Sequence, residues 1–188
     1  KSVEVESDGP VRACVKSVKT WGNSRFIERT YVYRNYPRIE YDLDVRWLET
    51  GSDSTHSPML RATFPINMEN SNFYNHVPFD VLERPIDGKI NGKPTPHYIQ
   101  HRDVYGVEAA DEDGQEVPAQ HWADLSDGKT GIALLNNCKY GHSVHEGKLR
   151  LTLMRAAGEP DRYPNLGKFN IRYALYPHEG DWQDGVWS

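Results

Sequence analysis

In the stretch from Arg38 to Leu48, charged and hydrophobic residues alternate as far as Trp47. Its hydrophobic positions are Ile39, Tyr41, Leu43, Val45 and Trp47, and its charged positions are Arg38, Glu40, Asp42, Asp44 and Arg46. Successive side chains of a β-strand point to opposite faces of the sheet, so this period of two predicts a half-buried strand with a charged outer face.

Similar β-rich runs occupy much of the rest of the chain. Residues 11–18 and 26–33 flank a Trp-Gly-Asn-Ser segment at 21–24, whose Gly-Asn pair is typical of a hairpin turn. Alternation returns at residues 60–66, 149–154 and 169–175, and we expect one strand from Phe73 to Leu82. No window of helical length carries an apolar stripe at 3.6-residue spacing with caps at both ends. The sequence therefore predicts an all-β fold, an antiparallel β-sandwich of roughly eight to twelve strands in two sheets.

The length of 188 residues predicts a single β-sandwich domain spanning residues 1–188. Between Arg84 and Gln120, proline and glycine residues interrupt any regular element. We therefore expect a long irregular excursion over residues 84–120, and loops of this length tend to be functional or mobile.

Composition excludes several classes of partner. The 22 basic and 27 acidic residues are interspersed and give a net charge of -5, so no positive field is available for nucleic acid. No apolar run is long enough to cross a bilayer, and residues 1–11 lack the apolar core of a signal peptide. Cys14 and Cys138 are too few for a disulfide framework, which favours a reduced pair and a cytoplasmic location. A single bridge between them is left open.

Candidate catalytic groups do not assemble into an active site. Asp42 and Asp44 share a strand face with other charged residues, which indicates a solvated surface rather than an acid/base pair. His142 and His145 have a metal-like spacing but no third ligand, and we place them in a turn. Ser126 fits a turn residue rather than a nucleophile. We therefore predict no catalytic residue, metal ion or other cofactor within this sequence.

The segment from His121 to Gly141 is the first place to look for function. A short apolar run at residues 131–135 is bounded by Asp-Gly in front and Asn-Asn behind, which predicts a buried strand followed by a polar loop. Polar loops fixed to rigid strands often carry binding or catalysis. The alternative is an ordinary hairpin turn. The candidate residues of the loop are Asn136, Asn137, Cys138, Lys139 and Tyr140.

The order and spacing of several sequence blocks resemble the C-terminal β-sandwich region of the α-mannosidases of glycoside hydrolase family 38. The resemblance rests on WADLSDG at 122–128, GIALLNNCKYG at 131–141, the strand at 149–155 and YALYPH at 173–178, with upstream support at 33–40, 64–65 and 77–85. The sequence departs from the family pattern after Pro85, where residues 86–116 contain no tryptophan. Asn137 stands where the family usually has Asp.

The resemblance implies a galactose mutarotase-like supersandwich from an enzyme that hydrolyses terminal α-mannosyl residues with retention, using two carboxylates. It also implies that both carboxylates and a zinc ion belong to an N-terminal catalytic barrel of the same polypeptide, which these residues do not include. This chain would then be a non-catalytic domain, inactive alone, that supports the barrel. The residues expected to line the rim of the α-mannoside pocket are Arg84, Asn136, Asn137, Lys139 and Tyr140.

Two alternatives belong to other classes of function. A stand-alone carbohydrate-binding module is favoured by the five Trp and eleven Tyr residues, among them Trp122, Tyr140, Tyr176 and Trp182 at expected strand ends or loops. A structural wedge between domains would bind no sugar and would expose a sizeable apolar patch.

Overall fold

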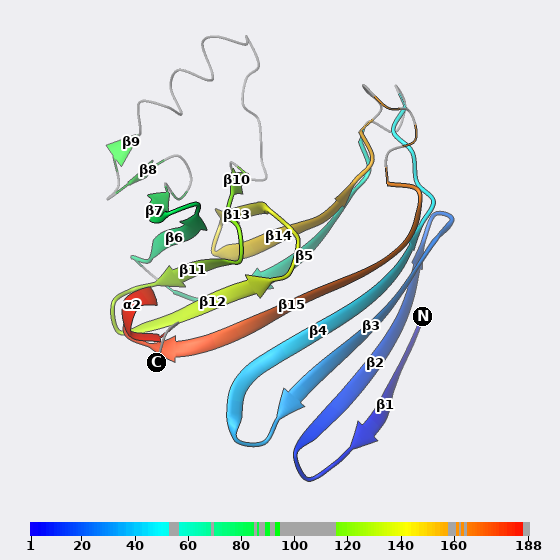
Figure 1. Ribbon diagram of the computed structural model, residues 1–188, viewed down its shortest axis with the longest axis horizontal. Helices are drawn as coiled ribbons and strands as arrows, with labels where there is room; N and C mark the ends of the chain where they lie inside the picture. Colours follow the sequence, from blue (N-terminus) through cyan, green and yellow to red (C-terminus); the bar gives the residue numbers. More distant parts are fainter. Residues whose placement is uncertain are drawn as a thin grey trace. The chain divides into compact units, whose positions relative to one another are not determined.

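The computed structural model describes residues 1–52, 57–68, 70–84, 86, 89–90, 93–94, 116–157, 161, 163 and 165–185 (Figure 1). The elements within these residues are β1 (Ser2–Asp8), β2 (Arg12–Trp21), β3 (Ser24–Tyr33), β4 (Tyr36–Trp47), β5 (Met59–Pro65), β6 (Asn72–Val77), β7 (Asp80–Arg84), β8 (Lys89–Ile90), β9 (Lys93–Pro94), β10 (Val117–Pro118), β11 (Trp122–Ser126), β12 (Thr130–Asn136), β13 (Gly141–His145), β14 (Lys148–Arg155), β15 (Gly167–Glu179) and α2 (Trp182–Gly185).

The chain falls into two compact units. Unit 1 comprises Lys1–Arg61, Leu134–Lys139 and Thr152–Pro177, and unit 2 comprises Ala62–Ala133, Tyr140–Leu151 and His178–Ser188. Strands β5, β12, β14 and β15 each contribute residues to both units. The single domain over residues 1–188 stays a prediction, and the expected excursion over 84–120 lies mostly outside the described residues.

Unit 1 is built on a meander of β1 to β4, with β15 antiparallel to β4 on its other side (Figure 1). The alternation predicted around Arg38–Leu48 is confirmed: Leu43, Val45 and Trp47 are buried, while Asp44 and Arg46 are exposed. Trp47 packs against Trp21 and Phe26, with ring centroids 6.1 and 6.4 Å away. The charged and apolar faces of β4 therefore fix which side of the sheet the core occupies.

Two local features shape the meander. The predicted hairpin turn at 21–24 is confirmed, with Gly22 in the left-handed conformation at φ 57° between Trp21 and Ser24. In β1, Val5 faces Val15 and Ser7 faces Cys14, so Glu6 is an extra residue that forms a β-bulge.

Unit 2 contains two antiparallel layers of strands. One layer has the order β12, β11, β6 and β7, and the other places β10, β13 and β14 side by side. Its core draws on both layers, since the buried apolar residues include Phe73, Ala123 and Leu125 from the first and Val144, Leu149 and Leu151 from the second. The antiparallel β-sandwich predicted from the sequence is confirmed.

The single strand expected from Phe73 to Leu82 is wrong. The segment is a hairpin in which β6 ends at Val77 and β7 begins at Asp80, and these two residues face each other. Pro78 has no backbone N–H to donate, and Phe79 adopts a left-handed conformation with φ 67°. The ladder therefore stops and the chain reverses within two residues.

The turns expected at Ser126 and at His142 are also wrong. Ser126 is the buried last residue of β11, and His142 is a buried residue of β13. The prediction treated these polar residues as loop residues, but both side chains are buried inside unit 2.

Candidate functional site

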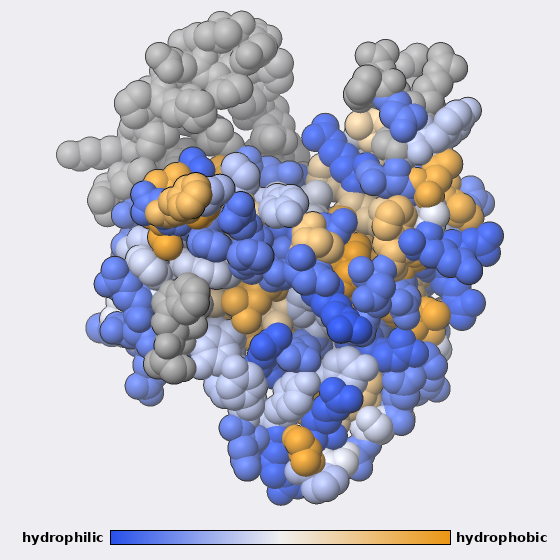
Figure 2. Space-filling view, in the orientation of Figure 1, coloured by the Kyte–Doolittle hydropathy of each residue, from blue (hydrophilic) through white to orange (hydrophobic). Residues whose placement is uncertain are grey.

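A polar pocket of about 550 Å³ lies in unit 1, over β2, β3, β4, β15 and the end of β12. Its polar lining includes Arg12, Tyr31, Glu40, Asp42, Asn136, Asn137 and Arg172. Figure 2 shows hydrophilic residues over much of strands β1 to β4, with hydrophobic residues scattered among them.

The register of three strands explains why these side chains meet. Asp42 of β4 lies opposite Arg29 of β3 and Arg172 of β15, and Glu40 lies opposite Tyr31 and Ala174. Opposite residues of neighbouring strands share a face. We call this side of the sheet the charged face; in order along the strands it carries Arg25, Ile27, Arg29 and Tyr31 of β3, Arg46, Asp44, Asp42, Glu40 and Arg38 of β4, and Lys168, Asn170 and Arg172 of β15.

The Asp42 carboxylate is held from one side of the pocket. Its Oδ2 atom lies 3.3 Å from Nε of Arg172, and its Oδ1 atom accepts a hydrogen bond of 2.5 Å from the Asn170 amide. The Asp42 side chain is 22% exposed, whereas that of Arg172 is 67% exposed. Asp42 is therefore fixed in place while Arg172 remains accessible to a ligand.

The Glu40 carboxylate is held by Arg38 and Tyr33. Its Oε1 atom lies 3.0 Å from Nε of Arg38, and its Oε2 atom accepts a 2.8 Å hydrogen bond from the Tyr33 hydroxyl. Arg12 donates to the same hydroxyl at 3.4 Å, which raises the pKa of the guanidinium, and lies 4.5 Å over the ring of Tyr31. This wall offers a carboxylate and an aromatic ring next to a cation.

Asn136 and Asn137 close the pocket from β12. Oδ1 of Asn136 accepts from the backbone N–H groups of Cys138 at 3.1 Å and Lys139 at 2.7 Å, which orders the loop as an Asx turn. The backbone N–H of Asn137 donates to the carbonyl of Arg172 at 3.3 Å, and its Oδ1 accepts from the Arg172 N–H at 3.4 Å. Asn136 therefore orders the loop, and Asn137, the residue after β12, is held against β15.

Two tyrosines form a rigid layer beneath the pocket. The rings of Tyr41 and Tyr173 stack with centroids 4.9 Å apart, and the Tyr173 hydroxyl donates to Glu28 at 2.9 Å. Burial raises the pKa of both hydroxyls, and the nearby Glu28 carboxylate adds to the effect. Both therefore stay neutral and supply shape and hydrogen bonds rather than proton transfer.

The structure brings together only two of the residues predicted from the sequence. Asn136 and Asn137 line the pocket, and Lys139 lies next to them in the same loop of unit 1 without lining it. Tyr140 is an exposed residue of unit 2, and Arg84 is the last residue of β7 in unit 2, opposite Phe73. Contact of any of the five with a substrate stays a prediction.

Sequence analysis missed most of the polar residues that line the pocket. Glu40 and Asp42 were assigned to a solvated surface, yet both are half-buried in the pocket wall, and Arg12, Tyr31 and Arg172 carried no local signal. The partner of Asp42 is far along the chain, so only the pairing of β4 with β15 reveals it.

Trp122 lies in an aromatic cluster of unit 2. Trp122 is buried and stacks on Trp182 and His76, with centroids 5.6 and 5.7 Å away, and His76 stacks in turn on His121. Burial lowers the pKa of His76, and His121 adds to this effect. Trp122 therefore contributes to the core rather than to a sugar surface.

A buried acid–histidine pair also lies in unit 2. Nε2 of His178 lies 2.6 Å from Oδ2 of Asp124, and the two side chains are 2% and 0% exposed. Nδ1 of His178 faces the Glu179 carbonyl at 3.1 Å, so this nitrogen carries a hydrogen. Burial raises the pKa of Asp124 against the opposing effect of His178. A substrate cannot reach this pair, which joins the end of β15 to β11.

Neither cysteine lines the unit 1 pocket. Cys14 is buried and Cys138 exposed, and both are free thiols. Burial raises the pKa of Cys14, and the Glu6 carboxylate beside it acts in the same direction.

Over the residues that the structure describes, no three His, Cys, Asp or Glu side chains are grouped to hold a metal ion. None of the helices among those residues is long and apolar enough to cross a membrane.

The sequence matches the family model described as the glycosyl hydrolases family 38 C-terminal domain over residues 1–163. The chain belongs to this family. The resemblance found in the sequence blocks is thereby confirmed.

Curated relatives of this family 38 domain are α-mannosidases. Alpha-mannosidase 2C1 of Homo sapiens is 32% identical over 162 residues, which cover 86% of this chain and 13% of the relative. Alpha-mannosidase G of Dictyostelium discoideum is 30% identical over 186 residues, which cover 96% of this chain and 15% of the relative. The chain thus spans about a seventh of these proteins or less.

A solved structure shares the fold of this family 38 domain. An alpha-mannosidase from Enterococcus faecalis V583 superimposes with a TM-score of 0.68 at 13% sequence identity, over 95% of this chain and 22% of that one. At this identity the likeness establishes the fold alone.

Proposed function

We propose that this chain is the non-catalytic β-sandwich domain of an α-mannosidase, and that the unit 1 pocket binds part of an α-mannoside. The observation that carries the proposal is the convergence of Asp42, Arg172 and Asn137 in one pocket of a family 38 domain. Relatives bearing the name α-mannosidase supply the substrate class.

The pocket has the chemistry that sugar hydroxyls require. Carboxylates accept hydrogen bonds from hydroxyl groups, and guanidinium and amide groups donate to them. Asp42 and Glu40 supply acceptors that arginines already hold in position, and Arg172 supplies exposed donors. Because each carboxylate is already bound to an arginine, its role is recognition rather than proton transfer.

Hydrolysis itself is proposed to take place on another part of the polypeptide. The family resemblance implies retention by two carboxylates and a zinc ion in an N-terminal barrel. The described residues do not fit a zinc site, since no three potential ligands are grouped among them. The much greater length of the relatives supports the presence of such a barrel.

Binding of mannose and α-mannobiose to the purified chain, measured by calorimetry or NMR titration, tests the pocket. We expect Asp42→Asn to weaken binding about tenfold to a hundredfold, because one hydrogen bond to a charged group is worth about 1.5–3 kcal/mol. The matched control is Asp8→Asn, which removes a carboxylate at the exposed end of β1 outside the pocket. Equal affinity of both variants for mannobiose would rule the pocket out.

Activity is tested separately. We expect the purified chain not to hydrolyse an aryl α-mannoside, because the pocket carboxylates Asp42 and Glu40 are already paired with Arg172 and Arg38. Turnover that disappears on substitution within this chain would overturn the non-catalytic role.

A stand-alone carbohydrate-binding module is the second candidate. It is favoured by the fact that residues of unit 1 alone line the pocket. Such a module should bind mannobiose with the same affinity alone and when fused to a family 38 barrel. A domain that only completes the pocket of the barrel should bind measurably better in the fusion.

A further inference from the structure

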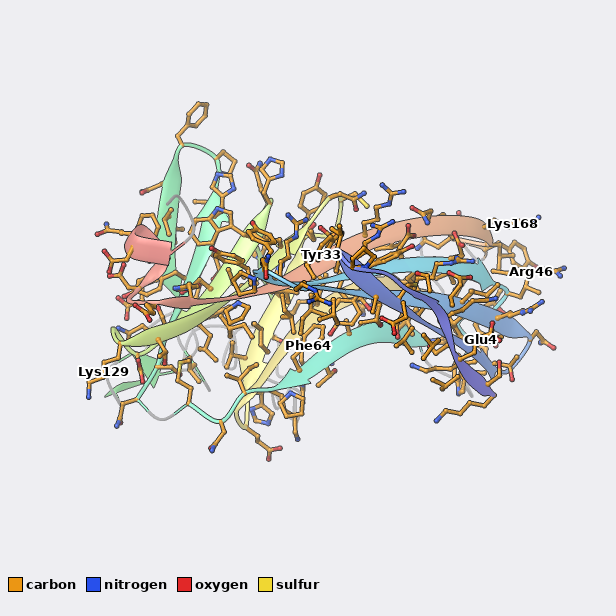
Figure 3. The ribbon with its side chains drawn as sticks, turned by 90° about the horizontal axis from the view of Figure 1, so that it is seen from below. Glu4, Tyr33, Arg46, Phe64, Lys129 and Lys168 are labelled. Carbon is orange, nitrogen blue, oxygen red and sulfur yellow. The ribbon has the colours of Figure 1, made fainter. Side chains whose placement is uncertain are left out.

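Three cations lie side by side across the charged face of unit 1. Arg46 of β4 is opposite Arg25 of β3 on one side and opposite Lys168 of β15 on the other. Figure 3 shows Arg46, near the end of β4, and Lys168, near the start of β15, close together on one side of the view. Like charges directly opposite each other in a sheet repel, so this cation row destabilises the free protein.

The other cations of the charged face are paired with acids. Arg29 lies 2.9 Å from Glu6 and 3.3 Å from Asp44, and Arg172 lies 3.3 Å from Asp42. Within the part of the chain that the structure describes, no salt bridge joins Arg25, Arg46 or Lys168 to a carboxylate. The cation row is therefore the uncompensated part of this face.

The cation row lines a pocket of its own. This pocket, of about 840 Å³, is bordered by the hairpin turn at Gly22–Asn23, the last residues of β4 and the first residues of β15. It shares no lining residue with the proposed mannoside pocket. The side chains of Arg25, Arg46 and Lys168 are all exposed at its surface and available to a ligand.

Nearby carboxylates do not neutralise the row. Asp44 lines the pocket but accepts from Arg29 and, at 2.9 Å, from the Asn170 amide. Glu49 is engaged by the hairpin turn, because its Oε1 atom accepts from the Asn23 N–H and the Ser24 hydroxyl, each at 2.8 Å. Asp44 is ion-paired with Arg29, and Glu49 is not among the residues that line the pocket, so a bound anion would meet three cations and one carboxylate that is already paired.

We propose that this pocket binds a tetrahedral oxyanion, the phosphate or sulfate group of a small molecule. Two guanidinium groups can each donate two parallel hydrogen bonds to such a group, and the lysine adds a point charge. Binding also relieves the repulsion within the row, so part of the affinity comes from strain that is already present in the free protein. The inference does not depend on the proposed mannoside pocket.

Titration of the purified chain with inorganic phosphate, at an ionic strength held constant with chloride, tests the site. We expect saturable one-to-one binding that weakens at least tenfold in Arg46→Gln and in Lys168→Gln. The matched control is Lys129→Gln, which removes an exposed lysine from the turn between β11 and β12 in unit 2 and should leave the affinity unchanged (Figure 3).

Separate arms with sulfate, mannose 6-phosphate and mannose identify the source of the anion. Tighter binding of mannose 6-phosphate than of phosphate supports a phosphorylated sugar as ligand, and equal binding supports a free oxyanion. Binding of mannose 6-phosphate that persists undiminished in Arg46→Gln would overturn the site.

Thermal unfolding distinguishes a binding role from a structural one. Arg46→Gln should raise the Tm of the free protein, because it removes repulsion, and should abolish the rise in Tm that phosphate produces in the unmodified chain. The proposal fails if phosphate shifts the Tm of the unmodified chain no more than chloride does. It also fails if phosphate shifts the Tm of the unmodified chain and of Arg46→Gln equally, because the cation row is then only a set of solvated charges.

Discussion

At the scale of single residues, buried polar groups show how strongly unit 2 depends on protonation. His142 is fully buried in β13, and its Nδ1 faces the Tyr140 carbonyl at 3.2 Å. Burial lowers the pKa of His142 from 6.5 to about 4, while the hydrogen bond to the carbonyl acts in the opposite direction. The folded protein therefore keeps this imidazole neutral at a pH where the unfolded chain binds a proton.

This difference predicts a loss of stability in mild acid. Between about pH 6.5 and pH 4 the unfolded state binds more protons than the folded state, so the free energy of unfolding should fall by roughly 3 kcal/mol as pH decreases. Urea unfolding at a series of pH values measures this free energy of unfolding. His142→Gln, which cannot titrate, should show a shallower dependence over this window, whatever its absolute stability. An unchanged slope would show that His142 does not carry the effect.

Gly131 makes room for the buried pair of Asp124 and His178. A Cβ atom at position 131 would clash with the His178 ring and would lie 2.9 Å from Cβ of Ser126. We expect Gly131→Ala to destabilise the protein by about 2–4 kcal/mol, because both neighbours are buried. Chemical denaturation measures the loss.

Gly128 provides the matched control in the adjoining turn. Nothing lies within 4 Å of a Cβ at that position, and its φ of 82° is the sole obstacle to a side chain. Gly128→Ala should cost only about 1–2 kcal/mol from backbone strain. A loss as large as that of Gly131→Ala would mean that the crowding around His178 is not the cause.

At the scale of elements, the hairpin of β6 and β7 carries an uncompensated strain at its tip. Phe79 has φ 67° and its side chain is fully exposed. We expect Phe79→Gly to stabilise the protein by about 1 kcal/mol, since glycine adopts this conformation without a steric penalty and no buried contact is lost. Thermal unfolding measures the change, with Tyr163→Gly as a control at another exposed aromatic. Destabilisation by Phe79→Gly would indicate that the ring makes a stabilising contact.

The same elements show where sequence analysis succeeds and where it stops. β4 was predictable because burial and charge alternate together along it, so a single strand contains the whole signal. The turn at Phe79 was not predictable, because phenylalanine rarely adopts a left-handed conformation and is not a typical turn residue. Most of the candidate pocket could not be predicted for a similar reason, since Asp42 and Arg172 meet only when β15 pairs with β4.

At the scale of the whole molecule, the sequence predicted the architecture better than the site. Alternating strands and short connections were enough to indicate an antiparallel β-sandwich, and ordered motif blocks indicated the family. The division into two compact units was not expected, because strands such as β12 contribute to both and contain no boundary signal. Local patterns describe strands, whereas sites and units depend on which distant strands become neighbours.

The bulge in β1 has a consequence for how this molecule behaves beside copies of itself. β1 is the last strand of its sheet, and its exposed Val3 and Val5 could template a strand from another chain. The extra residue Glu6 interrupts the regular spacing of backbone donors and acceptors after Val5, and its carboxylate lies 2.9 Å from Nε of Arg29. The straight run that could seed edge-to-edge aggregation is therefore only a few residues long, and a charged side chain stands at its end.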